Sequence, residues 1–460
     1  MARVFLIHPY FDMSLSVVPS LGLGYLASCL RAAGHEVQIL DALRDRLSAE
    51  RVADIVQTER PHLVGVTILS LFYPQARSLI RQLKRSCSSL VVIGGHHVTA
   101  LPEASLAETT ADFAAVGEGE QTIVDLASQI DHSRSFENIK GLVYQRNGSI
   151  VENERRAPIE DIDKIPFPAW ELIGPGKYPP ISHGTIHRRF PNAPIVTTRG
   201  CPYGCTFCAA RRTAGTKLRK RSAENVVTEL EMLYDRFGIR EFHFEDDNFA
   251  FEKEHAYQIC EEILRRNLRI YWSCPNGVRV DTLDDELLAT MKRSGCYMLA
   301  LGIESASQEI LDRARKKLNL DIVPDTVKRM RTHGILSMGF FIVGLPGETE
   351  ETARKSIDFA KRINLDFVKF THFVPLPGTE IFDELTGAGY NPEEFFRSHL
   401  MDRAVVETES LSRSDLTRLQ KRAHREFYFR PRAFLRSLAS IRPTQWRYLL
   451  RSLVSVFFNK

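Results

Sequence analysis

The chain has 460 residues, of which 43% are hydrophobic and 26% are charged, and its formal net charge is +4. This length predicts two or three domains with apolar cores, and so mild a charge does not favour a nucleic-acid partner. The chain opens on MARVFLIHPY without a basic leader, and no apolar run reaches the ~18–20 residues that span a bilayer. We therefore expect a cytoplasmic protein whose eight cysteines are reduced.

Residues 1–135 alternate short apolar runs with helix-spaced segments, which predicts a Rossmann-like, doubly wound parallel sheet of the α/β class. In such a sheet, ligands bind at the carboxyl ends of the strands. Glycines at these ends either let a bulky ligand approach the backbone or only form tight turns. The candidate binding residues at these ends are His8, Thr67, Ser70, Gly94, Gly95, His96, Gly117, Glu118 and Gly119.

Residues 136–190 are expected to form a linker, with a hairpin around Asn147-Gly148 and irregular, proline-rich segments. Residues 191–390 alternate strand and helix patterns again. The expected strands are 194–199, 240–246, 270–275, 297–305, 337–346 and 366–375. Six strands with crossover helices predict a partial or complete parallel barrel, with its chemistry at the carboxyl ends of the strands.

Residues 391–460 are predicted to be helical and basic. The last forty residues contain ten Lys or Arg, one Glu and interleaved aromatic residues. This composition suits an amphipathic helix on a membrane surface, a cap over the barrel, or the solvated face of a packed helix. The first alternative would make the protein peripherally membrane-associated.

The segment TTRGCPYGCTFCAARR places Cys201, Cys205 and Cys208 in a Cys-x3-Cys-x2-Cys pattern directly after a predicted strand. A structural zinc site would normally add a fourth Cys or His, but the next cysteine, Cys260, is more than fifty residues away. A four-iron cluster is normally held by four thiolates. Three thiolates would leave one iron open to a ligand from outside the protein.

This pattern resembles the hallmark of the radical S-adenosylmethionine (SAM) superfamily, and Phe207 occupies its aromatic position before the last cysteine. The resemblance implies a [4Fe-4S] cluster held by Cys201, Cys205 and Cys208. It also implies that the open iron chelates the amino and carboxylate groups of SAM. Reduction of the cluster then cleaves SAM to give a 5′-deoxyadenosyl radical.

Later strand ends also resemble this superfamily. FHFEDDNFAF, with Glu245, Asp246 and Asp247, is similar to the motif that binds the SAM amino group, although the usual Gly-Gly-Glu is absent. The resemblance implies that Glu304 contacts the ribose or methionyl part of SAM, and that the segment around Gly344 packs against adenine.

The first domain resembles the cobalamin-binding domain of B12-dependent radical SAM proteins over PSLGLGYLASCLRAAGHEV, VIGGHHVTALPE and AVGEGEQT, and the whole resemblance spans about residues 1–390. Because this domain lacks Asp-x-His-x-x-Gly, the resemblance implies cobalamin without a lower histidine ligand (His-off). It also implies a partial (β/α)6 radical SAM barrel at residues 191–390.

The implied activity is methylation of an unactivated carbon in a small or lipid-like substrate, with an electron donor such as flavodoxin or ferredoxin. One alternative is a radical cyclase or rearrangement enzyme, similar to the anaerobic magnesium-protoporphyrin monomethyl ester cyclase or to hopanoid-modifying enzymes. A second is a B12 or iron–sulfur sensor without turnover. The sensor would retain cobalamin but would not cleave SAM.

Overall fold

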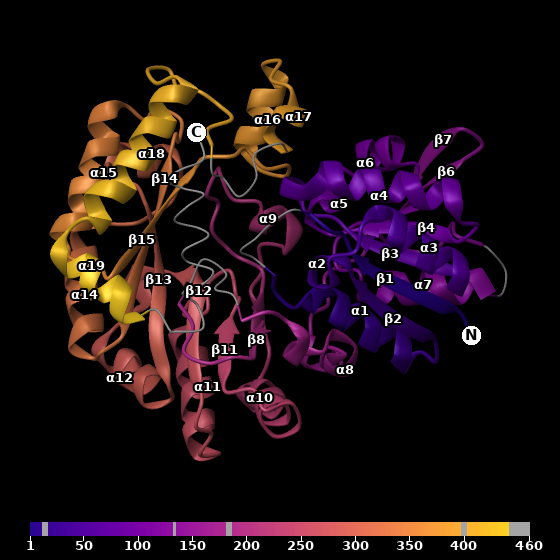
Figure 1. Cartoon of the computed structure of the whole chain (residues 1–460), viewed down its shortest axis with the longest axis horizontal. Coiled ribbons are helices and arrows are strands. Elements are labelled where there is room, and N and C mark those ends of the chain that lie inside the picture. The colour runs from indigo at the N-terminus through magenta and orange to yellow at the C-terminus, as the bar shows by residue number, and fades with distance from the viewer. Residues whose placement is uncertain (12–16, 132–134, 181–185, 397–402, 441–460) are drawn as a thin grey trace.

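The computed structural model describes residues 1–11, 17–131, 135–180, 186–396 and 403–440, and it contains two large sheets flanked by helices (Figure 1). The first sheet has the strand order β2-β1-β3-β4-β5-β6-β7. Its strands are β1 (Arg3–His8), β2 (Glu36–Asp41), β3 (Leu63–Thr67), β4 (Leu90–Gly94), β5 (Phe113–Ala115), β6 (Leu142–Arg146) and β7 (Ser149–Glu152).

Strands β1 to β5 are parallel, in the 2-1-3-4-5 order of a doubly wound sheet, which confirms the predicted fold class. The larger helices of this domain are α1 (Leu21–Ala32), α3 (Ala49–Glu59), α4 (Tyr73–Ser86), α6 (Pro102–Thr109) and α7 (Glu120–Asp131). The hairpin expected in the linker forms β6 and β7, and β6 pairs antiparallel with β5. The hairpin therefore extends the first sheet.

The second sheet has the order β15-β14-β13-β12-β11-β8, with all neighbours parallel. Its strands are β8 (Asn192–Ile195), β11 (Glu241–Phe244), β12 (Tyr271–Val278), β13 (Cys296–Glu304), β14 (Leu336–Val343) and β15 (Phe367–His372). Its helices are α10 (Ala223–Phe237), α11 (Lys253–Arg265), α12 (Asp285–Arg293), α13 (Gln308–Arg313), α14 (Val323–Thr332) and α15 (Glu350–Arg362). Because β8 and β15 are opposite edges, the barrel is open, as predicted.

The barrel core lies between the sheet and its outer helices. Phe242 and Phe244 of β11 are fully buried in this core, together with Trp272 of β12. Side chains alternate along a strand, so residues 241 and 243 point to the other face of the sheet. Short elements at the domain boundary and in the loops are α2 (Ala42–Asp45), α5 (His96–Ala100), β9 (Thr198–Arg199), α9 (Ala210–Thr213) and β10 (Arg219–Lys220).

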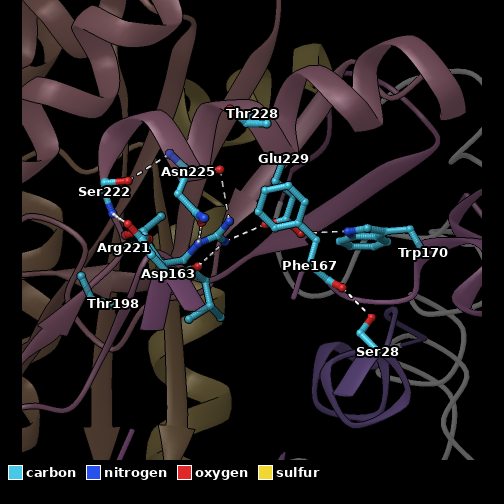
Figure 2. A network of polar contacts seen from close by, with 12 residues as sticks. Ser28, Asp163, Phe167, Trp170, Thr198, Arg221, Ser222, Asn225, Thr228 and Glu229 are labelled. Carbon is cyan, nitrogen blue, oxygen red and sulfur yellow. Dashed lines mark hydrogen bonds and ion pairs between the residues drawn. The ribbon is translucent and has the colours of Figure 1, made fainter. Parts of the chain in front are cut away.

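The connection between the domains is held by a buried polar network (Figure 2). Glu229 of α10 accepts hydrogen bonds from Trp170 Nε1 at 2.8 Å and from Arg221 Nη1 at 2.6 Å. Trp170 begins the short helix α8 (Trp170–Ile173). Three residues earlier, the Phe167 carbonyl accepts a bond from Ser28 of α1. The network therefore ties α1, the connecting segment and the barrel helix α10 together.

The helices after β15 are α16 (Glu380–Gly387), α17 (Pro392–Phe396), α18 (Arg413–Tyr428) and α19 (Pro431–Ser440), and residues 441–460 of the predicted basic tail lie outside the described residues. Helix α17 packs on the first domain, where Phe396 contacts Tyr73 and His97, whereas α18 lies along the outer edge of the barrel. The Tyr428 hydroxyl bonds to both the N–H and the carbonyl of Val368, and His424 Nε2 accepts from the Phe370 N–H. Helix α18 thus covers the free edge of β15. No helix in the described part of the chain is long and apolar enough to cross a membrane.

Candidate active site

The carboxyl ends of the two sheets meet at a cavity of about 490 Å³. The first domain lines it with the ends of β3 and β4, the loop after β5 and the start of α1, and the barrel lines it with residues that follow β8, β9 and β11. The predicted site residues in this lining are Thr67, Gly94, Gly95, His96, Gly117, Glu118, Gly119, Cys208, Glu245 and Asp247. The structure therefore brings residues expected at two different cofactor sites to one cavity.

The first-domain side of the cavity is built from small residues. Gly95 has a φ of +106°, and a Cβ atom there would lie 2.7 Å from the Ile68 carbonyl oxygen. At Gly22 and Gly117 a Cβ atom would have no neighbour within 4 Å. The cavity also reaches between the strands and α1, past Gly65. The small residues at the strand ends therefore leave space for a ligand that extends from the strand ends toward α1.

His8 and Ser70 lie outside the cavity lining. His8 Nδ1 is 3.4 Å from Asp41 Oδ1 at the end of the neighbouring strand β2. Ser70 Oγ lies 3.1 Å from His97 Nδ1, within the first domain. Both side chains thus lie near other residues of this domain, and their contact with cobalamin stays a prediction.

Glu118 lines the cavity, but its carboxylate is already engaged. It accepts hydrogen bonds from the Ile159 N–H at 2.6 Å, from Arg219 at 2.7 and 2.8 Å, and from Arg199 at 3.1 Å. Burial acts to raise the pKa of Glu118, but the bond from Ile159 and the two arginines lower it overall. We conclude that Glu118 joins the domains, while Gly117 and Gly119 leave space beside it.

The cysteine loop follows β9 and is anchored through its backbone. Gly200 has a φ of +99°, and a Cβ atom there would lie 2.2 Å from the Lys217 carbonyl oxygen, so only glycine fits. The Thr206 N–H donates to the Ala314 carbonyl at 3.1 Å, and the Cys208 N–H donates to the Cys205 carbonyl at 3.1 Å. These contacts fix the loop against the barrel.

Burial raises the pKa of all three thiols, that of Cys208 to about 11. The nearby cations Lys316 and Arg279 oppose this shift at Cys201 and Cys205. Metal ligation requires thiolates, and these cations favour the thiolate form.

The three acidic residues after β11 have different environments. Asp246 Oδ1 accepts bonds from the backbone N–H and the hydroxyl of both Thr197 and Thr198. Burial raises the pKa of Asp246 to about 6 in spite of these bonds. Glu245 and Asp247 instead line the cavity, and burial raises the pKa of each. Asp246 thus fastens β11 to the strand before the cysteine loop.

Glu304, Gly344 and Phe207 lie outside the cavity lining. Glu304 has a φ of +66° and forms a 2.9 Å ion pair with Lys316, whose charge also acts on Cys205. The Gly344 N–H donates to Glu348 Oε2 at 2.5 Å. Phe207 packs against the apolar cluster that includes Leu345 and Phe382.

Three cations at this site were not predicted from the sequence: Arg199, Arg279 and Lys316. Arg199 directly precedes Gly200 of the cysteine loop, so its place next to the cysteines in the sequence could have identified it as a site residue. Arg279 and Lys316 belong to none of the recognised motifs. Their proximity to the thiols arises only when β12 and the segment after α13 are folded.

Comparison with known proteins identifies the family. Residues 195–360 match the model of the radical SAM superfamily, and residues 8–127 match the B12 binding domain. The chain is 31% identical over 443 residues to an uncharacterized methyltransferase of Pyrococcus horikoshii, covering 96% of this chain and 94% of that protein. The chain belongs to the B12-binding radical SAM family.

Another relative of this radical SAM enzyme is the anaerobic magnesium-protoporphyrin IX monomethyl ester cyclase of Rubrivivax gelatinosus. The two are 28% identical over 447 residues, which is 94% of this chain and 78% of the cyclase. Among solved structures, the radical SAM methyltransferase TsrM of Kitasatospora setae, with cobalamin and a [4Fe-4S] cluster bound, superposes with a TM-score of 0.70. At 23% identity, with coverage of 84% and 75% of the respective chains, this similarity shows a shared fold.

Family membership makes the chain an enzyme and gives its cofactors: a [4Fe-4S] cluster, SAM and cobalamin. The cavity has the two features that these cofactors need. Its glycine-lined side belongs to the B12-binding domain, and its other side includes Cys208 of the cysteine loop.

Proposed function

We propose that this enzyme methylates an unactivated carbon of a small or lipophilic molecule. The supporting observation is the single cavity whose lining includes both Gly94 and Gly95 of the B12-binding domain and Cys208 of the radical SAM barrel. When bound, the cluster and SAM supply a 5′-deoxyadenosyl radical, and cobalamin supplies the methyl group. A shared cavity holds the reacting carbon within reach of both.

In this proposal, Cys201, Cys205 and Cys208 hold the cluster. Glu245 and Asp247 are carboxylates that line the cavity on the barrel side, so they are the candidates to bind the SAM amino group. The glycines at the ends of β4 and β5 allow cobalamin to approach the backbone closely.

A small acidic electron-transfer protein, such as flavodoxin or ferredoxin, is the proposed reductant. Arg211 and Arg212 are exposed and follow Cys208 by three and four residues. Their positive charge would attract an acidic partner to the surface beside the cluster loop.

We also propose peripheral contact between the C-terminal region and anionic membranes. Phe429, Phe434 and Leu435 are 69%, 54% and 63% exposed in a basic segment, a combination typical of interfacial helices. The full chain is expected to co-sediment with vesicles that contain anionic lipid. A chain ending at Tyr428, which keeps α18, is expected to remain in the supernatant.

Methyl-labelled SAM tests the main proposal. The reconstituted enzyme is incubated anaerobically with cobalamin, reductant and fractionated small-molecule extracts, and label is sought in carbon-bound methyl groups. Incorporation that requires Cys205 supports methylation. The cyclase relative provides the alternative of a non-methylating cyclisation or rearrangement, which predicts a new product without label.

A further inference from the structure

A second cluster of potential metal ligands lies inside the barrel, away from the cysteine loop. Glu241 is the first residue of β11, and His243 lies two residues later on the same face of the strand. His187 comes from the segment before β8. Their side chains are 0%, 4% and 0% exposed, respectively. Because a parallel strand begins at the end opposite its carboxyl terminus, this cluster lies below the cavity, toward the amino-terminal end of the barrel.

Hydrogen bonding orients the carboxylate of this cluster. Glu241 Oε2 accepts from the backbone N–H groups of Arg188 and Arg189, at 2.7 and 2.5 Å. The Tyr297 hydroxyl of β13 lies 2.7 Å from Glu241 Oε1 and 2.6 Å from the Ile186 carbonyl oxygen, and its single proton is donated to one of them. The carboxylate is thus held from two sides, with Oε1 directed toward both imidazoles.

The distances from the imidazoles to Oε1 are long for hydrogen bonds. His243 Nε2 is 3.3 Å and His187 Nδ1 is 4.0 Å from Glu241 Oε1, whereas good N–H···O bonds are ~2.7–3.2 Å long. Nitrogen and oxygen ligands at ~2.0–2.1 Å from a tetrahedral zinc ion lie about 3.3–3.4 Å apart. The 3.3 Å between His243 Nε2 and Glu241 Oε1 therefore matches the distance between two ligands of one tetrahedral zinc ion.

His187 lies beside the other two ligands but has its own contacts. Its Nδ1 lies 2.5 Å from the Asn192 side-chain amide, its ring stacks on Phe190, and its ring centroid is 4.5 Å from that of His243, at an angle of 57°. The ligand atoms of His187, Glu241 and His243 all lie within 4.8 Å of one another, and ion binding requires His187 to exchange its contact with Asn192 for the metal.

We propose that His187, Glu241 and His243 bind a zinc ion, with the Tyr297 hydroxyl or a water molecule as the fourth ligand. Two neutral imidazoles and one carboxylate suit zinc. The ion would join the segment before β8 to β11 and, through Tyr297, to β13. Its role is structural, because the ligands are buried and the cysteine loop lies at the opposite end of the strands.

The first test measures metal content in a chain that cannot hold the iron–sulfur cluster. The full chain carrying C201A, C205A and C208A is purified with a histidine-free tag, and its metals are measured by mass spectrometry. We expect about one zinc ion per chain, and loss of that ion in the same background with His243→Gln. The control His333→Gln removes a histidine from the end of α14 and should keep the zinc.

A cobalt titration keeps the proposal testable if His243→Gln fails to fold. The metal-stripped triple-cysteine variant, with all three proposed ligands intact, is titrated with Co²⁺ and followed by visible absorption. Uptake of one equivalent of Co²⁺, with the visible absorption of a tetrahedral cobalt site, supports the proposal. Absence of both zinc and cobalt uptake, or equal zinc in the His243→Gln chain, would overturn it.

Discussion

Arg199 Nη2 lies 2.7 Å from Glu120 Oε1, and this ion pair joins the strand before the cysteine loop to the first domain. The two side chains are only 16% and 9% exposed. Arg199 is two residues from Cys201, and Glu120 begins α7 just after the glycines that line the cavity. The pair therefore couples the positions of the two halves of the proposed active site.

Breaking this pair should destabilise the protein. Arg199→Met leaves the Glu120 carboxylate buried without its cation, a change that typically costs about 3–5 kcal/mol. We expect a lower urea midpoint and weaker cobalamin retention. Lys217→Met, which removes the exposed ion pair with Glu160, is the control and should cost at most about 1 kcal/mol. Equal effects of the two substitutions would contradict a coupling role for Arg199.

Gly22 offers a probe of the cobalamin side of the cavity. It lies in the first turn of α1 and lines the cavity, and a Cβ atom added there would have no neighbour within 4 Å. Gly22→Leu should therefore leave folding intact while filling part of the cavity, and cobalamin affinity should fall at least about tenfold. That change corresponds to about 1.4 kcal/mol. Gly387→Leu in α16, a similarly open helical position outside the cavity lining, should bind cobalamin normally in the same equilibrium titration.

Cys205→Ala should abolish the four-iron cluster and SAM cleavage together. The expectation follows from the three-thiolate loop, which has no spare cysteine nearby. Iron and sulfide content and 5′-deoxyadenosine formation are measured after anaerobic reconstitution. Cys87→Ala, in the first domain after α4, is the control and should keep both. A full cluster with SAM cleavage in Cys205→Ala would refute the ligand assignment.

Glu348 should make stability depend on pH. Burial raises its pKa to about 7, against the hydrogen bond from the Gly344 N–H. The folded chain then holds this proton more tightly than the unfolded chain, whose glutamate pKa is ~4.3. The stabilising contribution of protonated Glu348 is therefore fully present below the unfolded-state pKa of ~4.3. Above it, the free energy of unfolding falls as the pH rises to about 7.

Glu348→Gln removes this contribution and provides the test. We expect the variant to gain about 2–3 kcal/mol over the parent between pH 5 and pH 8 in urea unfolding, at ~1.4 kcal/mol per pKa unit. Glu350→Gln, at the exposed start of α15, is the control and should show no such gain. Parallel stability curves for Glu348→Gln and the parent would contradict the raised pKa.

The strands and the cysteine loop were predictable because their signals are local. Buried parallel strands appear as short apolar runs, and Cys201, Cys205 and Cys208 lie within eight residues of each other. The position of the β6–β7 hairpin on β5 was not predictable, because a hairpin pattern does not identify the strand beside it.

The roles of neighbouring acidic residues were the least predictable part of the site. Glu245, Asp246 and Asp247 are consecutive, and strand geometry turns Asp246 toward Thr197 and Thr198 while the other two reach the cavity. Glu118 likewise meets arginines about 80 and 100 residues away in the chain. Such partners depend on how the two domains pack, which motif spacing does not encode.

The products formed from SAM test the central claim most directly. The enzyme is reconstituted anaerobically with iron, sulfide and hydroxocobalamin, then given a reductant and SAM, and both nucleoside products are quantified. A cobalamin-dependent methylase predicts S-adenosylhomocysteine together with 5′-deoxyadenosine. Formation of 5′-deoxyadenosine without S-adenosylhomocysteine would contradict methylation and favour a radical cyclisation or rearrangement.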